Sequence, residues 1–337
     1  MPENIRSAAV DIASYILTGL ALMMVLHLNL LAALFSGLLV YSLVHLMTPA
    51  LGKNISSDRA RMIVVAALSL VIVAFWSIAI WAGVSFFRND IGHMQALLQK
   101  MADILESSRG QMPAWVQQHL PDNALELKEM IIAWLREHAL EAQHLGQATG
   151  RTLAHLVIGM IIGAMVALYD STRPRVYRPL GTALHQRAVN LHDSFRQVVF
   201  AQVRISAINT VFTATYLFVI LPAFGVRLPL LKTMTAITFF AGLLPVIGNL
   251  ISNSVLVVVG LSHSLPIALA SLAFLVLIHK LEYFLNARII GSHINARAWE
   301  LLVAMLVMES MFGLPGVIAA PVFYAYIKRE LGDRGLV

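Results

Sequence analysis

Long apolar runs separated by short charged segments dominate the sequence. No Asp, Glu, Lys or Arg occurs in the 36 residues from Ile12 to Met47. As a single helix this run would measure about 54 Å, whereas the hydrocarbon core of a bilayer is about 30 Å thick. The run therefore predicts two transmembrane helices, near 12–28 and 30–47, and the polar residues His27 and Asn29 predict the turn between them.

The same reasoning predicts further spans along the rest of the chain. They are Met62–Phe87, Leu153–Tyr169, Ile205–Phe224, two spans within the uncharged residues Thr233–His279, and a last run Leu301–Ile327 that contains one charge, at Glu309. Gly260 and Pro266 predict the turn inside the long run. Gly159 and Gly163 have the small-xxx-small spacing that lets two membrane helices approach closely.

Two charged segments between these runs are predicted to be amphipathic helices. Residues 88–151 repeat apolar positions at three- and four-residue spacing, which predicts helices that cap the bundle or lie on the membrane surface. Residues 171–204 place Arg178, Arg187 and Arg196 against apolar positions. That stretch predicts an interfacial helix facing anionic headgroups, or alternatively a solvated connector.

These elements predict an all-α, polytopic helical membrane protein with about eight transmembrane helices and a small helical extramembrane segment. Its expected parts are spans 1–3 in 1–87, an extracytoplasmic segment 88–151, span 4 in 152–170, a cytoplasmic basic helix 171–204, spans 5–8 in 205–327 and a cytoplasmic tail 328–337. Short segments on one side collect thirteen Lys and Arg, and the other side collects Arg227, Lys232, Arg288 and Arg297. The positive-inside rule then favours both termini in the cytoplasm. The chain is expected to be a multi-pass protein of the cytoplasmic (inner) cell membrane.

Composition excludes several classes of protein. Charged residues make up 12% of the chain and hydrophobic residues 58%, with a mean hydropathy of +0.76; soluble domains carry about 25% charge. The net charge of +6 is not clustered as a nucleic-acid site requires. There is no Cys, no zinc-binding His-Glu-x-x-His, no nucleophile elbow and no phosphate loop. No catalytic residue, metal or cofactor is therefore predicted.

Glu309 is the strongest candidate functional residue, because ionisable groups at bilayer depth are costly. It lies close to Gly313, Pro315 and Gly316, which can open the backbone. A carboxyl at that depth is predicted to act as a proton carrier or a cation ligand. The alternative interpretations are a packing hydrogen bond from a neutral Glu, or a wet position near the interface.

Two further groups of residues are candidates for a transport pathway. His279, Glu282 and Asn286 share one face of the seventh span, where they line a pathway or simply form a polar helix end. The stretch from Gly242 to Asn249 contains Pro245 and Gly248 and is expected to break the sixth helix, with Asn253 one turn beyond. Broken helices supply unpaired backbone groups for solutes, while a simple proline kink is the alternative.

The C-terminal half resembles the autoinducer-2 exporter family of membrane proteins. The resemblance is carried by Leu243-Leu-Pro245-Val-Ile-Gly248, by Glu282-Tyr-Phe-Leu-Asn286, and by Phe312-Gly313-Leu-Pro315-Gly316-Val-Ile-Ala-Ala-Pro321. The chain departs from the family pattern at Asn249, where Pro is usual, and at Glu309, where small residues are common. The resemblance implies a secondary permease or exporter of small solutes, with homo-oligomers among its members.

The leading hypothesis is a secondary transporter that moves a small polar solute or signal such as autoinducer-2 outward, coupled to H⁺ or Na⁺ through Glu309. Its expected partners are membrane lipid, the solute, the coupling ion and further copies of the chain. The alternative hypotheses are a structural or lipid-handling membrane protein without transport activity, and an intramembrane enzyme, which would need a polar cluster at one depth.

Overall fold

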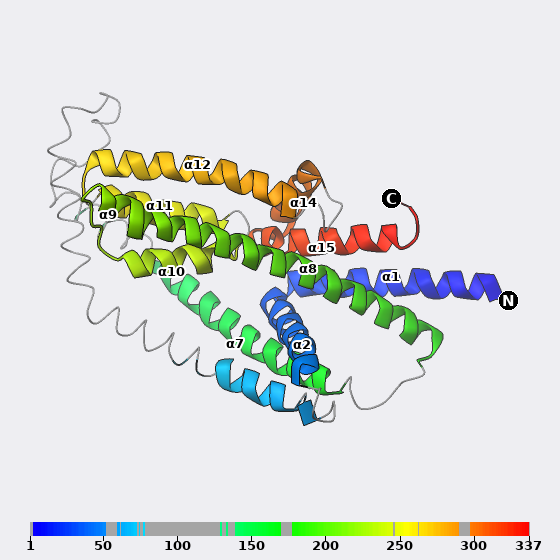
Figure 1. Cartoon of the computed structure of the whole chain (residues 1–337). Helices are drawn as coiled ribbons and strands as arrows, with labels where there is room; N and C mark the ends of the chain where they lie inside the picture. Colours follow the sequence, from blue (N-terminus) through cyan, green and yellow to red (C-terminus); the bar gives the residue numbers. More distant parts are fainter. Residues whose placement is uncertain are drawn as a thin grey trace. The chain divides into compact units, whose positions relative to one another are not determined.

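The computed structural model describes most of the apolar part of the chain (Figure 1). The described residues are 3–51, 59–60, 62–72, 74, 77, 129, 133, 139–169, 177–244, 247–261, 263–289 and 297–336. The predicted extracytoplasmic helices of 88–151 lie largely outside them. All regular elements in the described ranges are helical, and four helices there are long and apolar enough to cross a membrane. The prediction of an all-α polytopic membrane protein is confirmed.

The chain divides into two compact units. Unit 1 comprises Met1–Phe75, Gln147–Ala201 and Ile289–Val337, and unit 2 comprises Trp76–Gly146 and Gln202–Arg288. The described helices of unit 1 are α1 (Glu3–His27), α2 (Leu31–Leu51), most of α7 (Ala139–Tyr169), the first part of α8 (Pro179–Thr215), α14 (Ala298–Phe312) and α15 (Leu314–Gly332), together with the helical residues 62–72. Asn29 has a φ of 57° in the turn between α1 and α2, a conformation that Asn tolerates better than most residues.

Helices α2 and α7 approach closely through glycine. A Cβ added to Gly159 would lie 2.1 Å from the carbonyl oxygen of Ala33, and one added to Gly163 would lie 2.2 Å from that of Gly37. No larger side chain fits at such distances, so the backbones themselves are in contact. Ser36 adds a hydrogen bond of 2.9 Å to the carbonyl oxygen of Leu156. The close approach predicted from the spacing of Gly159 and Gly163 is thus observed.

The last apolar run is two helices, contrary to the single span predicted for Leu301–Ile327. Helix α14 ends at Phe312, Gly313 adopts a φ of 61°, and α15 begins at Leu314 with Pro315 in its first turn. The two helices pack together: a Cβ on Gly316 would lie 1.9 Å from the carbonyl oxygen of Met308. Residues 298–332 therefore form a hairpin. Pro321 lies buried inside α15, which continues past it.

The hairpin is closed at its base by a cluster of polar side chains. The carboxylate of Glu300 accepts hydrogen bonds from the Lys328 ammonium, at 2.8 Å, and from the Tyr324 hydroxyl. These two bonds lower the pKa of Glu300 to about 2, so the carboxylate is ionised at physiological pH. Arg297, which the charge pattern placed on the opposite side from Lys328, lies next to this cluster. That assignment assumed a straight final helix, whereas the Arg297 backbone N–H donates to the Glu300 carboxylate at 3.2 Å. The side of the membrane on which Arg297 lies stays a prediction.

Helix α8 is continuous for 37 residues, about 55 Å. It joins the predicted basic amphipathic stretch to the predicted fifth span without a break. Arg187, expected to face headgroups or solvent, is only 6% exposed, and Phe195 is buried beside it on the same helix. The expectation for Arg187 was wrong because acidic partners on two distant helices, the buried Glu330 and the partly exposed Asp11, hold its guanidinium.

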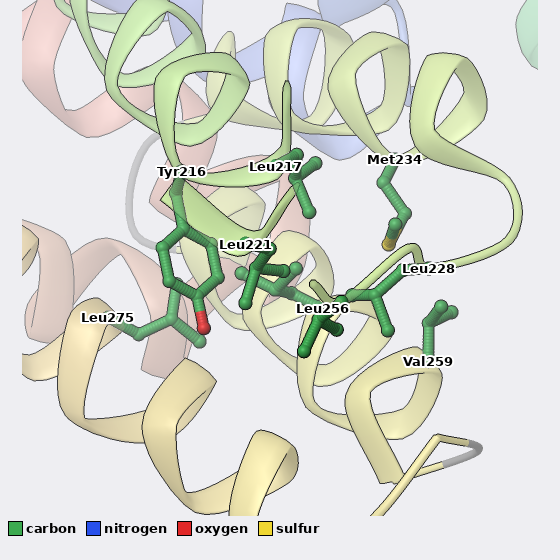
Figure 2. Close-up of a cluster of buried hydrophobic side chains, with 9 residues drawn as sticks. Tyr216, Leu217, Leu221, Leu228, Met234, Leu256, Val259 and Leu275 are labelled. Atoms are coloured by element: carbon green, nitrogen blue, oxygen red, sulfur yellow. The ribbon is translucent and has the colours of Figure 1, made fainter. Parts of the chain in front are cut away.

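Unit 2 contains the remainder of α8 and a second pair of packed short helices. Its other elements are a π-helical turn η2 (Tyr216–Ile220), α9 (Leu221–Ala223), α10 (Leu231–Gly242), α11 (Ile247–Leu261) and α12 (Leu265–Ile289). A buried apolar cluster links them (Figure 2). It joins Met234, near the start of α10, to Leu256 and Val259, near the end of α11. Since the start of α10 packs against the end of α11, the two helices run side by side and form a second hairpin.

Candidate functional site

Glu309 lies on α14, four residues before the turn of the C-terminal hairpin. Its backbone carbonyl accepts the N–H of Gly313 at 2.7 Å, and its side chain is exposed. Nine residues separate it from Glu300 at the hairpin base, which is about 13 Å along a helix. If the base lies at the membrane surface, Glu309 lies near the middle of a hydrocarbon core about 30 Å thick. Within the described residues, no hydrogen bond or ion pair ties its carboxylate into helix packing.

The other helix break lies between α10 and α11, at the position expected from sequence. A Cβ on Gly248 would lie 1.8 Å from the carbonyl oxygen of Ala241, so only glycine allows the start of α11 to pack on the end of α10. Pro245 falls outside the described residues. Asn249 and Asn253 occupy the first two turns of α11 and are half-buried.

Two polar side chains of α8, which the sequence analysis did not single out, bond to the end of α10. Gln202 donates to the carbonyl oxygen of Gly242 at 2.8 Å, and Ser206 donates to that of Phe239 at 2.6 Å. The last carbonyls of a helix lack partners within it, and these bonds satisfy two of them. The two hydrogen bonds attach the end of α10 to α8. Tertiary contacts therefore help to hold the helix break in place.

His279, Glu282 and Asn286 all lie on α12, which is unbroken from Leu265 to Ile289. The helix keeps the three positions on one face. The surroundings of their side chains are outside the described residues. Their place in a transport pathway stays a prediction.

A buried charge network, which the sequence analysis missed, joins α1, α8 and α15 within unit 1. Arg187 forms an ion pair with Glu330, and both side chains are buried. The Arg187 guanidinium also stacks over the ring of Tyr15, 4.0 Å from its centroid, and lies 3.7 Å from Asp11. Asn190 donates to Glu330 and to Asp333, both at 3.0 Å.

The network continues to the exposed ends of the same helices. Arg334 pairs with Asp11 at 2.9 Å, and Arg329 pairs with Asp193 at 2.8 Å. These contacts bring the N-terminal part of α1 and the C-terminal part of α15 to the same end of unit 1. The partners are 143 residues apart in the case of Arg187 and Glu330, so no local motif could have indicated the pair.

Ser42, His192 and Asp193 form a polar chain next to this network. The Ser42 hydroxyl lies 2.8 Å from His192 Nε2, and His192 Nδ1 lies 3.4 Å from Asp193. Such an order is found in serine hydrolases. However, Ser42 is only 2% exposed and also donates to the carbonyl oxygen of Leu38 at 2.7 Å. A hydroxyl so buried and so bonded fits helix packing better than nucleophilic attack.

Comparison with known proteins assigns the family. The model of the AI-2E family transporters matches residues 12–333, nearly the whole chain. The chain belongs to the AI-2E transporter family. No curated protein and no solved structure matches the chain.

Membership in the AI-2E family agrees with the architecture in the described residues. Members of this family are transporters, which supports a membrane transport function for the chain rather than an enzymatic one. Within the described residues, α1, α2, α7 and α8 are long and apolar enough to cross a membrane. Membership identifies neither the solute nor the coupling ion.

Proposed function

We propose that the chain exports a small polar solute, such as autoinducer-2, across the cytoplasmic membrane, with coupling to H⁺ or Na⁺ through Glu309. The observation that carries the proposal is the C-terminal hairpin, which puts Glu309 about 13 Å beyond the ion pair of Glu300 and Lys328. A carboxylate at that depth is costly unless it binds a proton or a cation.

The hairpin of α10 and α11 supports a solute site. At 12 and 15 residues, its helices measure about 18 and 22 Å, too short to cross a bilayer individually. A helix break inside a membrane is a usual place for solute and ion sites. Asn249 and Asn253 add amide groups at that point.

The orientation belongs to the same proposal. Arg334 pairs with Asp11, which is consistent with both termini on one side. The basic residues near these ends favour the cytoplasmic side by the positive-inside rule.

Gradient-driven flux in proteoliposomes tests the coupling role of Glu309. The expected result is that wild-type chain moves solute in response to a proton or sodium gradient. Glu309→Gln is expected to lower the gradient-driven rate about tenfold or more, a factor that corresponds to ~1.4 kcal/mol of barrier. The matched control is Ser310→Ala, an exposed neighbour on α14, which should retain the wild-type rate.

Two results would contradict different parts of this proposal. Flux that is unchanged in Glu309→Gln would remove the coupling role but leave transport intact. Absence of flux from correctly folded wild-type protein, across a panel of small polar solutes and both ion gradients, would overturn the transport function itself.

A further inference from the structure

A groove of about 400 Å³ runs along unit 1 between α1, α14 and α15. Its walls include Gly19, Leu22 and Leu26 of α1, Met308 and Phe312 of α14, and Phe323 of α15. These side chains carry no hydrogen-bonding group other than weakly accepting sulfur. The groove is therefore suited to a hydrocarbon chain and not to the small polar solute of the transport proposal.

One end of the groove is polar and the other is apolar. Tyr15 and Glu330 line the polar end, and the Tyr15 hydroxyl donates to the Glu330 carboxylate at 3.2 Å. From Tyr15 to Leu26 the groove follows eleven residues of α1, about 16 Å. Half of a hydrocarbon core about 30 Å thick is nearly the same length. The groove is thus long enough to hold much of one acyl chain.

The groove is continuous with the lipid-facing surface of the protein. Ile16, Leu20 and Met24, which flank it on α1, are 56%, 55% and 59% exposed. In a membrane protein such a surface is covered by lipid tails. A lipid that lies against α1 can therefore enter the groove sideways, without a path through the protein.

The charges around the polar end select the headgroup. Three carboxylates, of Asp11, Glu330 and Asp333, face two guanidinium groups, of Arg187 and Arg334, in one bonded network. The net charge of these five groups is −1, which disfavours an anionic lipid headgroup. Arg334 and Asp11 are partly exposed, with side chains 42% and 37% accessible, so both signs of charge are available to a zwitterionic headgroup.

We propose that this groove binds one acyl chain of a phosphatidylethanolamine-type phospholipid. Its tail lies along α1 between Tyr15 and Leu26, its phosphate faces Arg334, and its ammonium group faces Asp11 and Asp333. Neither Glu309 nor any residue of the break between α10 and α11 lines the groove. The lipid proposal therefore does not rest on the transport proposal.

Native mass spectrometry of protein purified from mixed phosphatidylethanolamine and phosphatidylglycerol membranes tests the site. A Cβ on Gly19 meets no atom within 4 Å, so Gly19→Trp fills the groove without displacing backbone. Wild-type protein is expected to retain one phosphatidylethanolamine, and Gly19→Trp to retain at least about tenfold less, equivalent to a loss of ~1.4 kcal/mol of binding. Leu20→Trp adds the same indole on the exposed face and should retain lipid as wild type does.

Thermal unfolding keeps the test decisive if the tryptophan variant is poorly folded. Added phosphatidylethanolamine should raise the Tm of delipidated wild-type and Leu20→Trp protein, because a ligand stabilises the state that binds it. The smaller substitution Gly19→Leu should abolish that increase. Equal lipid retention by wild type and both Gly19 variants, or selective retention of phosphatidylglycerol, would overturn the proposal.

Discussion

Replacing Arg187 or Glu330 alone with methionine is expected to destabilise the protein by about 3 kcal/mol, because each replacement removes the closest ion-pair partner of a buried charge. Arg187 is 6% exposed and Glu330 is 4% exposed. Replacing both together removes the uncompensated charge. The double variant Arg187→Met, Glu330→Met is therefore expected to recover most of the loss, since Asp11 keeps Arg334 and Asn190 keeps Asp333.

Thermal and denaturant unfolding in detergent measure these differences as a double-mutant cycle. Arg196→Met is the matched control, because Arg196 lies on the same helix α8 but is exposed; its change in stability is expected to stay within about 0.5 kcal/mol. Additive losses in the double variant would show that Arg187 and Glu330 act independently. The description of a coupled buried pair would then be wrong.

The C-terminal hairpin is expected to fail when Gly316 is replaced by alanine. The new Cβ would lie 1.9 Å from the carbonyl oxygen of Met308, and a backbone atom cannot move aside as a flexible side chain can. Overpacking costs about 1–3 kcal/mol even where side chains can adjust, so the loss of stability should reach at least the upper part of that range. Transport should be lost with it if the hairpin carries Glu309 into the membrane.

Gly332→Ala in the same helix is the matched control for this substitution. No atom lies within 4 Å of a Cβ at Gly332. Unfolding temperature and yield of monodisperse protein should be unchanged in Gly332→Ala and reduced in Gly316→Ala. Equal stability of the two alanine variants would show that α14 and α15 do not pack through Gly316.

The helical, membrane-spanning character of the chain could be predicted from sequence because it depends on local properties. The uncharged run from Ile12 to Met47 is too long for one span, and the structure has α1 and α2 there, with Asn29 in the turn. Gly159 and Gly163 indicated close helix packing because the absence of a side chain is itself visible in the sequence. Each of these features is determined within a short stretch of chain.

The hairpin and the charge network could not be predicted in this way, because both depend on residues far apart in the sequence. The run Leu301–Ile327 has the length of one span, and the chain reversal at Gly313 is stabilised by Lys328 and Tyr324 bonding to Glu300. The local sequence around Arg187 is that of a surface arginine in a basic stretch. Its buried partner Glu330 is brought to it only by the fold. Among the candidate site residues, Glu309 was selected for its charge, whereas its depth depends on the hairpin.

Cysteine accessibility tests the hairpin of α14 and α15 most directly, and the natural absence of cysteine makes the chain a clean background. Single cysteines would replace Arg297, before α14, and Leu336, after α15. A hairpin predicts that a membrane-impermeant maleimide labels both from the same side of sealed vesicles, and from the cytoplasmic side if the proposed orientation holds. Labelling of the two positions from opposite sides would mean a single final span, and would contradict the depth assigned to Glu309.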